Sequence, residues 1–155
     1  MKQAGAVAEA MTEKCVFCKI MGGEKYQPVI YHDGLCTAFM DINQPNPYHV
    51  LIVPNSHAED IYALSADEAS AIFQLSARLS HAIRRVTNCP GLNVLSNNGR
   101  VAGQTVFHFH LHLMPRFQGD RLRLAAGLMG RKYPKTDAEL ERMTSNLKDQ
   151  LAKSE

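Results

Sequence analysis

The segment that most constrains the fold is VFHFHLHLMPR, residues 106–116, in which histidines alternate with phenylalanine and leucine. Successive side chains of a β-strand point to opposite faces of the sheet. The alternation therefore predicts a strand over residues 105–115, ended by Pro115. One face of this strand presents three imidazoles, those of His108, His110 and His112. The opposite face packs into the core through Phe107, Phe109, Leu111 and Leu113.

Three histidines in a run of five residues are unusual in a chain that holds seven in 155. The simplest interpretation, a polar strand face that happens to carry histidine, is therefore disfavoured. Neighbouring imidazoles on one face lie about 6.6 Å apart. Two protonated rings at that separation repel by about 2.5 kcal/mol at an effective dielectric constant of about 20. The run is thus expected to be mostly neutral near pH 7, and a neutral imidazole is a nucleophile or a metal ligand.

Two kinds of site fit these histidines. A bound phosphate would favour a protonated histidine beside a nucleophilic one. The preceding loop NNGRVAGQT, residues 97–105, offers glycine N–H groups to such a ligand, although an ordinary turn explains the loop equally well. The alternative is a catalytic zinc ion held by a His-x-His pair. Three consecutive imidazoles span about 13 Å, so at most two adjacent ones can share one ion.

The rest of the chain predicts an α+β fold with a sheet of about five antiparallel strands, because the strand–helix alternation of a parallel sheet is missing. Asp33-Gly34 is a two-residue hairpin signal between the first two strand candidates. The strand candidates that join the histidine run are PVIYH, LCTAFMD, YHVLIVP and LNVLS.

Three helices are expected besides the strands. The short N-terminal one covers VFCKIMGG and stops at Gly22-Gly23. The long one starts at a capping box formed by Ser65 and Glu68 and ends near Asn88. The C-terminal one starts at a second box, Thr136 and Glu139, and its apolar stripe is formed by Leu140, Met143, Leu147 and Leu151.

Composition places the chain among ordinary globular proteins, with 45% hydrophobic and 21% charged residues. We expect residues 1–14 to be a disordered lead-in and residues 15–155 to form one domain. The net charge of +2 requires no polyanion as partner. Nucleic acid is not expected, because the basic stretch is interpreted as a solvated face: Arg116, Arg121, Arg123, Arg131 and Lys132. No apolar run reaches a membrane span of about 20 residues and no signal peptide is recognised, so a cytoplasmic protein is expected.

Two of the four cysteines form the pair Cys15-x-x-Cys18. This spacing is typical of a metal or redox site rather than of a disulfide framework. A thioredoxin-like pair should follow a strand and open a helix, whereas this pair precedes any clear strand. As half of a zinc site, the pair needs two more ligands.

Three segments together resemble the histidine-triad family of nucleotide hydrolases and transferases. They are GQTVFHFHLHLMPR, AFMDINQPNPYHVLIVPNSH and LNVLSNNG, and the resemblance extends over residues 15–117. It implies the histidine-triad fold and cleavage at the α-phosphate of a purine nucleotide derivative, either a nucleoside phosphoramidate or a dinucleoside polyphosphate. It also implies a homodimer.

The resemblance further implies a role for individual residues. His110 would attack the α-phosphate and form a nucleotidyl-histidine, which water then hydrolyses. His112, Gln104 and the Thr105 hydroxyl would stabilise charge on the phosphate, and Thr105 would also help to protonate the leaving group. The remaining implied contacts are support of the site by His49, ribose binding by Asp41, base packing by Ile42, and a phosphate or ribose contact by Asn97.

One branch of the family carries Cys-x-x-Cys near its start. By that resemblance a structural zinc ion would be held by Cys15, Cys18, His57 and His108. Such a site would tie the N-terminus to the catalytic strand and fix the orientation of His110. Two other functions also fit the residues. They are a nucleotide-binding regulatory protein with vestigial hydrolysis, and a zinc hydrolase that uses the His-x-His pair directly.

Overall fold

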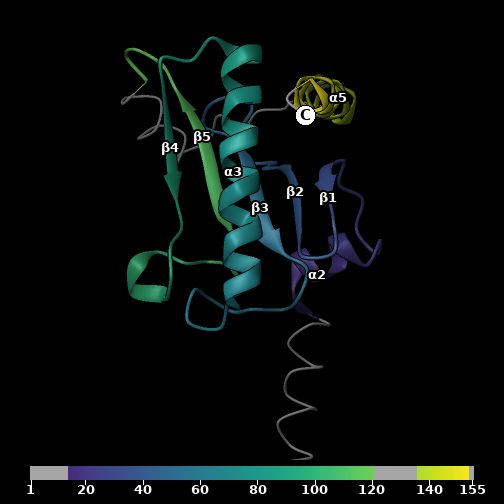
Figure 1. Cartoon of the computed structure of the whole chain (residues 1–155), viewed down its shortest axis with the longest axis vertical. Coiled ribbons are helices and arrows are strands. Elements are labelled where there is room, and N and C mark those ends of the chain that lie inside the picture. Colours follow the sequence, from purple (N-terminus) through teal and green to yellow (C-terminus); the bar gives the residue numbers. More distant parts are fainter. Residues whose placement is uncertain (1–13, 121–135, 154–155) are drawn as a thin grey trace, which may run out of the picture.

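The computed structural model describes residues 14–120 and 136–153, and in this part of the chain the predicted α+β fold is confirmed. Five strands form one antiparallel sheet in the order β1-β2-β3-β5-β4 (Figure 1). The described strands are β1 (Val29–His32), β2 (Cys36–Met40), β3 (Val50–Pro54), β4 (Gly91–Leu95) and β5 (Leu111–Arg116). The described helices are α2 (Val16–Met21), α3 (Ala66–Thr87) and α5 (Asp137–Ala152), with the 3-10 turn η1 (Arg100–Ala102).

The hairpin between β1 and β2 turns one residue later than the sequence signal predicts. The Asp33 N–H donates to the Cys36 carbonyl at 3.1 Å, so Gly34 and Leu35 are the two central residues of the turn. The Asp33 carboxylate accepts hydrogen bonds from the backbone N–H groups of Leu35 and Cys36 at 2.7 and 2.8 Å. This local bonding is what makes aspartate a good first residue of a turn.

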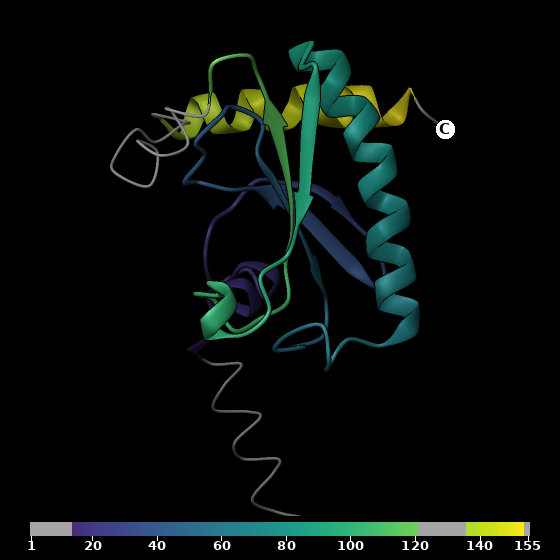
Figure 2. The same ribbon diagram turned by 90° about the vertical axis from the view of Figure 1, so that its left-hand side faces the viewer.

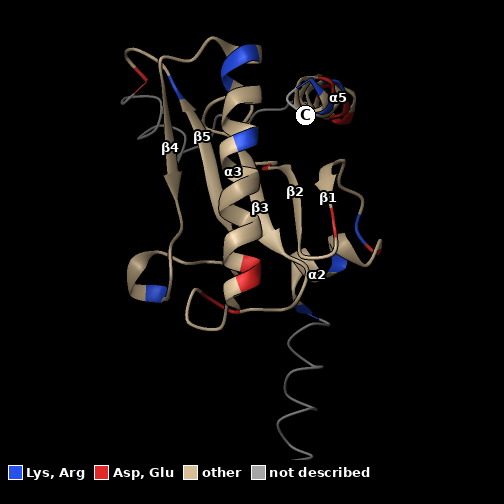
Figure 3. Cartoon of the chain, in the orientation of Figure 1, with Lys and Arg blue, Asp and Glu red and all other residues tan. Residues whose placement is uncertain are grey.

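Helix α3 begins and ends as predicted. The Ser65 hydroxyl accepts from the Glu68 N–H while the Glu68 carboxylate accepts from the Ser65 N–H, which completes the capping box. Asn88 ends the helix in the left-handed conformation, with φ 55°. The first turn is acidic and the last turn is basic, an arrangement that complements the helix dipole (Figure 3).

The two shorter helices also follow their sequence signals. Helix α2 stops at Gly22, whose N–H donates to the Cys18 carbonyl at 2.8 Å. In α5 the Thr136 hydroxyl accepts from the Glu139 N–H at 3.2 Å. The predicted apolar stripe of α5 is buried: Leu140, Met143, Leu147 and Leu151.

The sheet separates two packed layers, with α3 on one side and α2 on the other (Figure 2). Alternate residues of β2 and β3 point to opposite faces. On one face Ala38 and Ile52 pack beneath α3 and α5. On the other face Phe39 and Leu51 pack against Phe17 of α2. Both strands are buried along their whole length, which explains why they read as continuous apolar runs.

The last strand is shorter than the alternation predicts, because β5 begins only at Leu111. The Phe109 N–H donates to the carbonyl of Ala58, beyond the end of β3, at 2.6 Å. The backbone before Leu111 is therefore bonded outside the ladder that joins β3 to β5. Pro115 does not end the strand as predicted, because it lies inside β5, which continues to Arg116.

The predicted division of the histidine run into two faces holds around β5. Three apolar residues of the run join the core beneath α3 and α5: Phe109, Leu111 and Leu113. Phe107 is the exception, since it is half-buried with the Arg100 guanidinium 4.7 Å from its ring centre. The prediction that the histidines line a surface is wrong for His108 and His110. Both are buried, because the Phe17 ring of α2 packs edge-on against them.

Part of the sequence prediction lies outside the described residues. This applies to the lead-in over residues 1–14, apart from Lys14, and to the basic stretch, apart from Arg116. Arg116 forms an ion pair with Asp120 at 2.7 Å. Among the described helices, none has the length and apolar character needed to cross a membrane.

Candidate active site and metal centre

The three histidines of the run have three different surroundings. His108 turns toward the two N-terminal cysteines, His110 faces a pocket, and His112 contacts His49. A straight strand would have pointed all three the same way. They diverge because His108 and His110 precede β5, where the backbone leaves the sheet ladder.

Cys15, Cys18, His57 and His108, here called the Cys/His cluster, converge as the resemblance implies. One ligand atom from each residue lies within 4.8 Å of all the others. The Cys15 Sγ is 3.5 Å from His108 Nδ1. The Cys18 Sγ is 3.3 Å from His57 Nδ1 and 3.6 Å from His108 Nδ1. Two thiolates and two imidazoles are a ligand set of closed tetrahedral zinc sites.

The electrostatics of the Cys/His cluster also suit a bound cation. His108 Nε2 lies 3.0 Å from the Pro54 carbonyl, so Nε2 carries the hydrogen and Nδ1 keeps its lone pair for a metal. Burial lowers the pKa of His108 to about 4. Burial also raises the pKa of the Cys18 thiol to about 12, with Cys15 adding to the rise. A dication would stabilise both thiolates, and the cluster is therefore compatible with zinc.

His110 is held with one ring nitrogen free. Its Nδ1–H donates to the carbonyl of His108 at 2.8 Å, which leaves the lone pair on Nε2. The ring is 6% exposed and packs against Phe17, with 5.3 Å between ring centres. Burial lowers the pKa of His110, so the ring is neutral near pH 7. The expected neutrality of the run has burial, rather than mutual repulsion, as its main cause.

Asp41, His49 and His112 form a chain of contacts beside His110. His49 Nε2 lies 2.9 Å from His112 Nδ1. His49 Nδ1 lies 3.6 Å from the Asp41 carboxylate and has no hydrogen-bond partner among the described residues. Burial lowers the pKa of His112 to about 3. Burial also lowers the pKa of His49, against the opposing charge of Asp41.

The order of this chain favours one tautomer for each ring. With its Nδ1–H toward Asp41, His49 can only accept at Nε2, and it accepts from the Nδ1–H of His112. His112 Nε2 is then a free acceptor. If His112 takes up a proton there, the negative charge of Asp41 stabilises the cation through His49.

The loop between β2 and β3 brings Asp41 and His49 together. The Asp41 N–H donates to the His49 carbonyl at 2.9 Å, and the Gln44 side chain accepts from the His49 N–H at 3.3 Å. Tyr48 takes a positive φ of 66°, an unusual conformation for a bulky residue. His49 directly precedes β3, and its side chain contacts His112 of the neighbouring strand β5.

A pocket of about 310 Å³ opens beside His110. Its apolar wall includes Val16, Phe17, Ile20, Phe39 and Leu51. Its polar side carries Asp41, Thr105, His110 and His112. Ile42 lies at the rim and is 47% exposed. The pocket thus joins an apolar wall, suited to a flat ring system, to a group of histidines and a carboxylate.

Three of the predicted catalytic and nucleotide-binding residues do not line this pocket. His49 lies behind His112. The Gln104 side chain is committed to the backbone: its Nε2 donates to the Glu59 and Val106 carbonyls, and its Oε1 accepts from the Gly99 N–H. Gln104 therefore shapes the loop before the histidines, and its predicted ligand contact stays a prediction. Asn97 does not line the pocket either, and its predicted contact with phosphate or ribose stays a prediction.

Sequence reasoning missed the contribution of the N-terminal segment to the pocket. Helix α2 supplies Val16, Phe17 and Ile20, and the loop after it supplies Lys25 and Gln27. The Gln27 Nε2 donates to the Met40 carbonyl at 2.7 Å, which anchors this loop beside Asp41. The spacing of the apolar residues in α2 was a signal for a buried helix face, but not for what that face covers.

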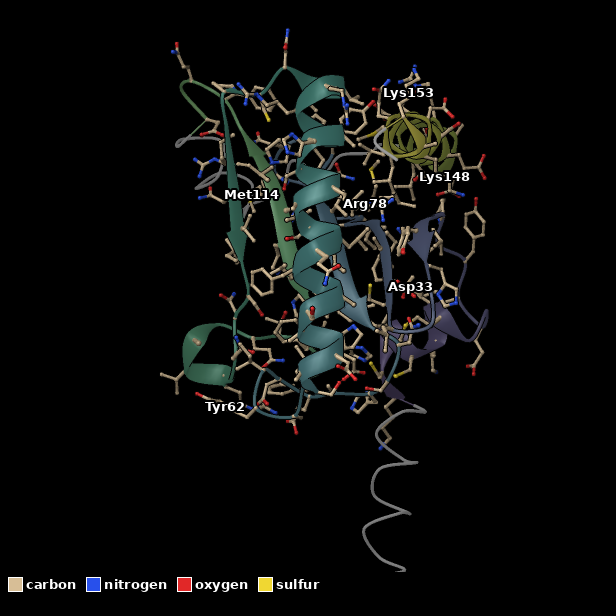
Figure 4. The ribbon with its side chains drawn as sticks, viewed as in Figure 1. Asp33, Tyr62, Arg78, Met114, Lys148 and Lys153 are labelled. Carbon is tan, nitrogen blue, oxygen red and sulfur yellow. The ribbon has the colours of Figure 1, made fainter. Side chains whose placement is uncertain are left out.

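A second hollow, of about 420 Å³, lies between the β1–β2 hairpin and α3. Asp33 and Arg78, both labelled in Figure 4, are among its lining residues. The Arg78 guanidinium sits 5.6 Å from the Tyr31 ring centre. No histidine or cysteine is among the described residues that line this hollow.

An antiparallel sheet that carries a His-x-His-x-His run beside an apolar pocket defines a protein of the histidine-triad class. The HIT domain family model matches residues 22–119 of this chain. The Bacillus subtilis (strain 168) protein named Protein hit is 36% identical over 143 residues, which are 92% of this chain and 97% of that protein. The chain belongs to the HIT family, whose members are nucleotide-binding hydrolases and transferases.

Two further similarities are informative. Adenylylsulfatase HINT3 of Arabidopsis thaliana is 32% identical over 144 residues, covering 93% of this chain and 73% of that protein. The crystal structure of a Zn-bound histidine triad family protein from Mycobacterium smegmatis superposes with a TM-score of 0.77 at 29% identity. That alignment covers 92% of this chain and 96% of the other.

Proposed function

We propose that this protein is a nucleotidyl hydrolase or transferase that cleaves at the α-phosphate of a purine nucleotide derivative through a nucleotidyl-histidine on His110. The observation that carries the proposal is the state of His110. Its ring is neutral, its Nδ1–H is bonded to the His108 carbonyl, and its Nε2 is free beside a pocket. A neutral imidazole in a fixed orientation is a nucleophile that needs no base to activate it.

The remaining pocket residues would bind different parts of the nucleotide. The apolar wall receives the base, with Ile42 at the rim against its face. The Asp41 carboxylate accepts hydrogen bonds from the ribose hydroxyls. Thr105 and His112 contact the phosphate oxygens, where charge accumulates in phosphoryl transfer. Contacts of Asn97 and Gln104 with the phosphate or ribose remain predictions from the family resemblance.

The reaction proceeds in two displacements. His110 Nε2 attacks the α-phosphorus, a P–N bond to histidine forms, and the bond from phosphorus to the leaving group breaks. The leaving group takes a proton from the Thr105 hydroxyl. Water then attacks the same phosphorus, transferring its proton to His112 Nε2, and the P–N bond breaks to release the nucleoside monophosphate. The proton held by His112 finally returns to the Thr105 oxygen, which restores both groups for the next turnover. The Asp41–His49 pair stabilises His112 while it carries that proton.

We further propose that the Cys/His cluster holds a structural zinc ion. Zinc would be bound by the Sγ atoms of Cys15 and Cys18 and the Nδ1 atoms of His57 and His108. Four protein ligands leave no open position for substrate, which disfavours a zinc hydrolase using the His108–His110 pair. A structural ion would hold helix α2 in place, and α2 forms part of the pocket wall. The four free cysteines suit the reducing cytoplasm that we propose as its location.

We also propose a homodimer that pairs two copies through β4. This strand ends the sheet order, so one of its edges has no partner strand within the described chain. Val94 is 46% exposed, and η1, which carries the exposed Val101, lies at the same side (Figure 1). Light scattering should give twice the chain mass of 17.2 kDa. Val94→Lys should yield the monomer, and Leu35→Lys, in the β1–β2 turn, should leave the dimer intact.

The hydrolase proposal is tested by intact-protein mass spectrometry after brief mixing with an adenosine phosphoramidate. Wild type should show a transient adduct of adenylate mass, and His110→Ala should show none. Adenosine 5′-phosphosulfate and a dinucleoside polyphosphate belong in the same experiment, since the HINT3 relative is named an adenylylsulfatase. Binding of these compounds without adduct or turnover would instead favour a nucleotide-binding regulatory protein.

A further inference from the structure

The capping box of α3 contains a carboxylate that does more than cap a helix. Glu68 is 7% exposed, and both of its oxygens are occupied. Oε2 accepts from the Ser65 N–H at 3.0 Å and from the Ser65 hydroxyl at 2.6 Å. Oε1 accepts from the Ser56 hydroxyl at 2.5 Å. The capping box requires only the first of these bonds, so the contact with Ser56 calls for another explanation.

The Ser56 contact joins α3 to the segment that supports the Cys/His cluster. Ser56 directly precedes the cluster residue His57. Two residues before Ser56, the Pro54 carbonyl accepts from His108 Nε2. Both histidines of the cluster are therefore tied to residues 54–57, and Glu68 holds this short segment from the side of α3.

Glu68 also places a negative charge near the cluster. Burial opposes that charge, but the hydrogen bonds from Ser56 and Ser65 outweigh it, and the pKa of Glu68 lies below its ordinary value. Glu68 is thus ionised at neutral pH. The carboxylate lies against residues 54–57, the segment that carries His57 and the Pro54 carbonyl bonded to His108.

His57 lacks the outer partner that a metal-binding histidine normally has. Its Nδ1 faces Cys18, while its Nε2 is buried and has no hydrogen-bond partner among the described residues. Histidines that bind a metal commonly donate their second N–H to a carboxylate or carbonyl, and that partner strengthens metal binding. For His108 the partner is the Pro54 carbonyl. For His57 no such bond is present within the described part of the chain, but the Glu68 carboxylate accepts a hydrogen bond from Ser56, the residue directly before it.

We propose that Glu68 is a positioning residue for the Cys/His metal centre, which it supports by fixing the His57 segment through Ser56 and by supplying a negative charge outside the ligands. This inference rests on the zinc part of the proposed function and is independent of hydrolysis at His110. It gives the capping box two roles. The same carboxylate starts the long helix and stabilises the metal-loaded state.

Substitution by glutamine separates these two roles. Glutamine serves as well as glutamate at this position of a capping box, so Glu68→Gln keeps the helix start. It removes the charge and places an amide N–H donor, in place of the Oε1 acceptor, opposite the Ser56 hydroxyl. Asp67→Asn is the matched control, because it removes one charge from the exposed side of the same helical turn. Each full-length protein is titrated against a chromophoric chelator to measure its zinc dissociation constant. The melting temperature of each metal-free form is measured alongside.

We expect Glu68→Gln to weaken zinc binding roughly tenfold, the lower end of the effect of removing an outer partner. Asp67→Asn should stay within about twofold of the zinc affinity of wild type. Metal-free Glu68→Gln should melt below metal-free wild type, because the hydrogen-bonded carboxylate stabilises the fold, but it should be fully folded at the temperature of the titration. The cobalt(II) absorption of Glu68→Gln should keep the thiolate bands of wild type, which would show that the four ligands are retained. Equal zinc affinity in Glu68→Gln and wild type would overturn the inference and leave Glu68 a helix cap.

Two outcomes separate this inference from its premises. A wild-type protein that binds no zinc would contradict the metal centre itself. The proposal that His110 reacts with nucleotide is tested separately and does not depend on the zinc titrations. If Glu68→Gln does not fold, Ser56→Ala replaces it, since that change breaks the link to Oε1 and leaves the capping box whole. Zinc should then pass to the chelator several-fold faster than from wild type, and an unchanged rate would count against the role of Glu68.

Discussion

At the scale of single residues, burial and hydrogen bonding give three similar imidazoles different chemistry. His108 directs Nδ1 to two cysteines, His110 directs Nε2 to the pocket, and His112 is backed by His49 and Asp41. In each case a partner of one ring nitrogen decides what the other nitrogen can do. The proposed roles of the three histidines in metal binding, attack on phosphorus and proton transfer rest on these partners.

Thr105 offers a sharp test of the leaving-group step. Thr105→Ala should lower kcat about 100-fold, the lower end of the usual effect of a general acid, for a phosphoramidate, whose amine leaving group needs a proton. It should have little effect on a nucleotide ester with an acidic phenol as leaving group. Thr105→Ser keeps the hydroxyl and should retain most of the activity on both substrates. An equal loss on both would show that the hydroxyl binds phosphate and does not protonate the leaving group.

The buried His112 should make the stability of the protein depend on pH. Its pKa falls from 6.5 to about 3 on folding, so the unfolded chain binds the proton more readily. The resulting stability is fully present above pH 6.5 and is lost as the pH falls toward 3. Between pH 7.5 and pH 5, wild type should lose about 2 kcal/mol more of its free energy of unfolding than His112→Asn. Urea titrations at the two pH values measure this difference, and parallel losses would contradict the assignment.

At the scale of elements, capping residues mark where the helices begin, and side chains from several elements form the site. Helix α2, the loop after β2 and the segment before β5 each supply part of the pocket wall. Capping could be recognised locally, because Ser65 and Thr136 each bond a backbone N–H only three residues ahead. The pocket could not be recognised from neighbouring residues, because its walls come from parts of the chain up to about 100 residues apart.

The cap of α5 should contribute measurably to stability. Thr136→Ala removes the side chain that accepts the Glu139 N–H, and should lower the free energy of unfolding by about 1 kcal/mol. Thr136→Ser retains the hydroxyl and should stay close to wild type. Chemical denaturation compares the three proteins. A Thr136→Ala protein as stable as wild type would mean that water replaces the cap at no cost.

At the scale of the whole molecule, the Cys/His cluster connects the N-terminal segment to both the β3 end and the histidine run. Removing zinc should therefore lower the stability of the fold without directly changing catalysis at His110. Chelation should lower the melting temperature by several degrees, and activity should decline only as the protein unfolds. Immediate loss of activity from a still folded protein would point to a catalytic ion. Cys18→Ser should reproduce the low melting temperature without chelator.

The linear order of residues was sufficient for what depends on neighbours along the chain. The alternation in residues 106–116, the capping boxes and the Cys-x-x-Cys spacing predicted the antiparallel α+β fold, the helix starts and a set of metal ligands, because these signals act over a few residues. Resemblance to known proteins was needed to assign His110 as nucleophile and to join Cys15 and Cys18 to His57 and His108.

What folding added depends on contacts between distant segments. The strand stops short of His110 because the Phe109 N–H bonds to Ala58, and no pattern in residues 105–110 reveals that partner. His49 meets His112 only once β3 pairs with β5, since the two histidines belong to segments far apart in the chain. Glu68 reaches Ser56 only once α3 lies across the sheet. Orientation, burial and outer partners are properties of the packed chain, and these properties give three histidines of the same run different surroundings.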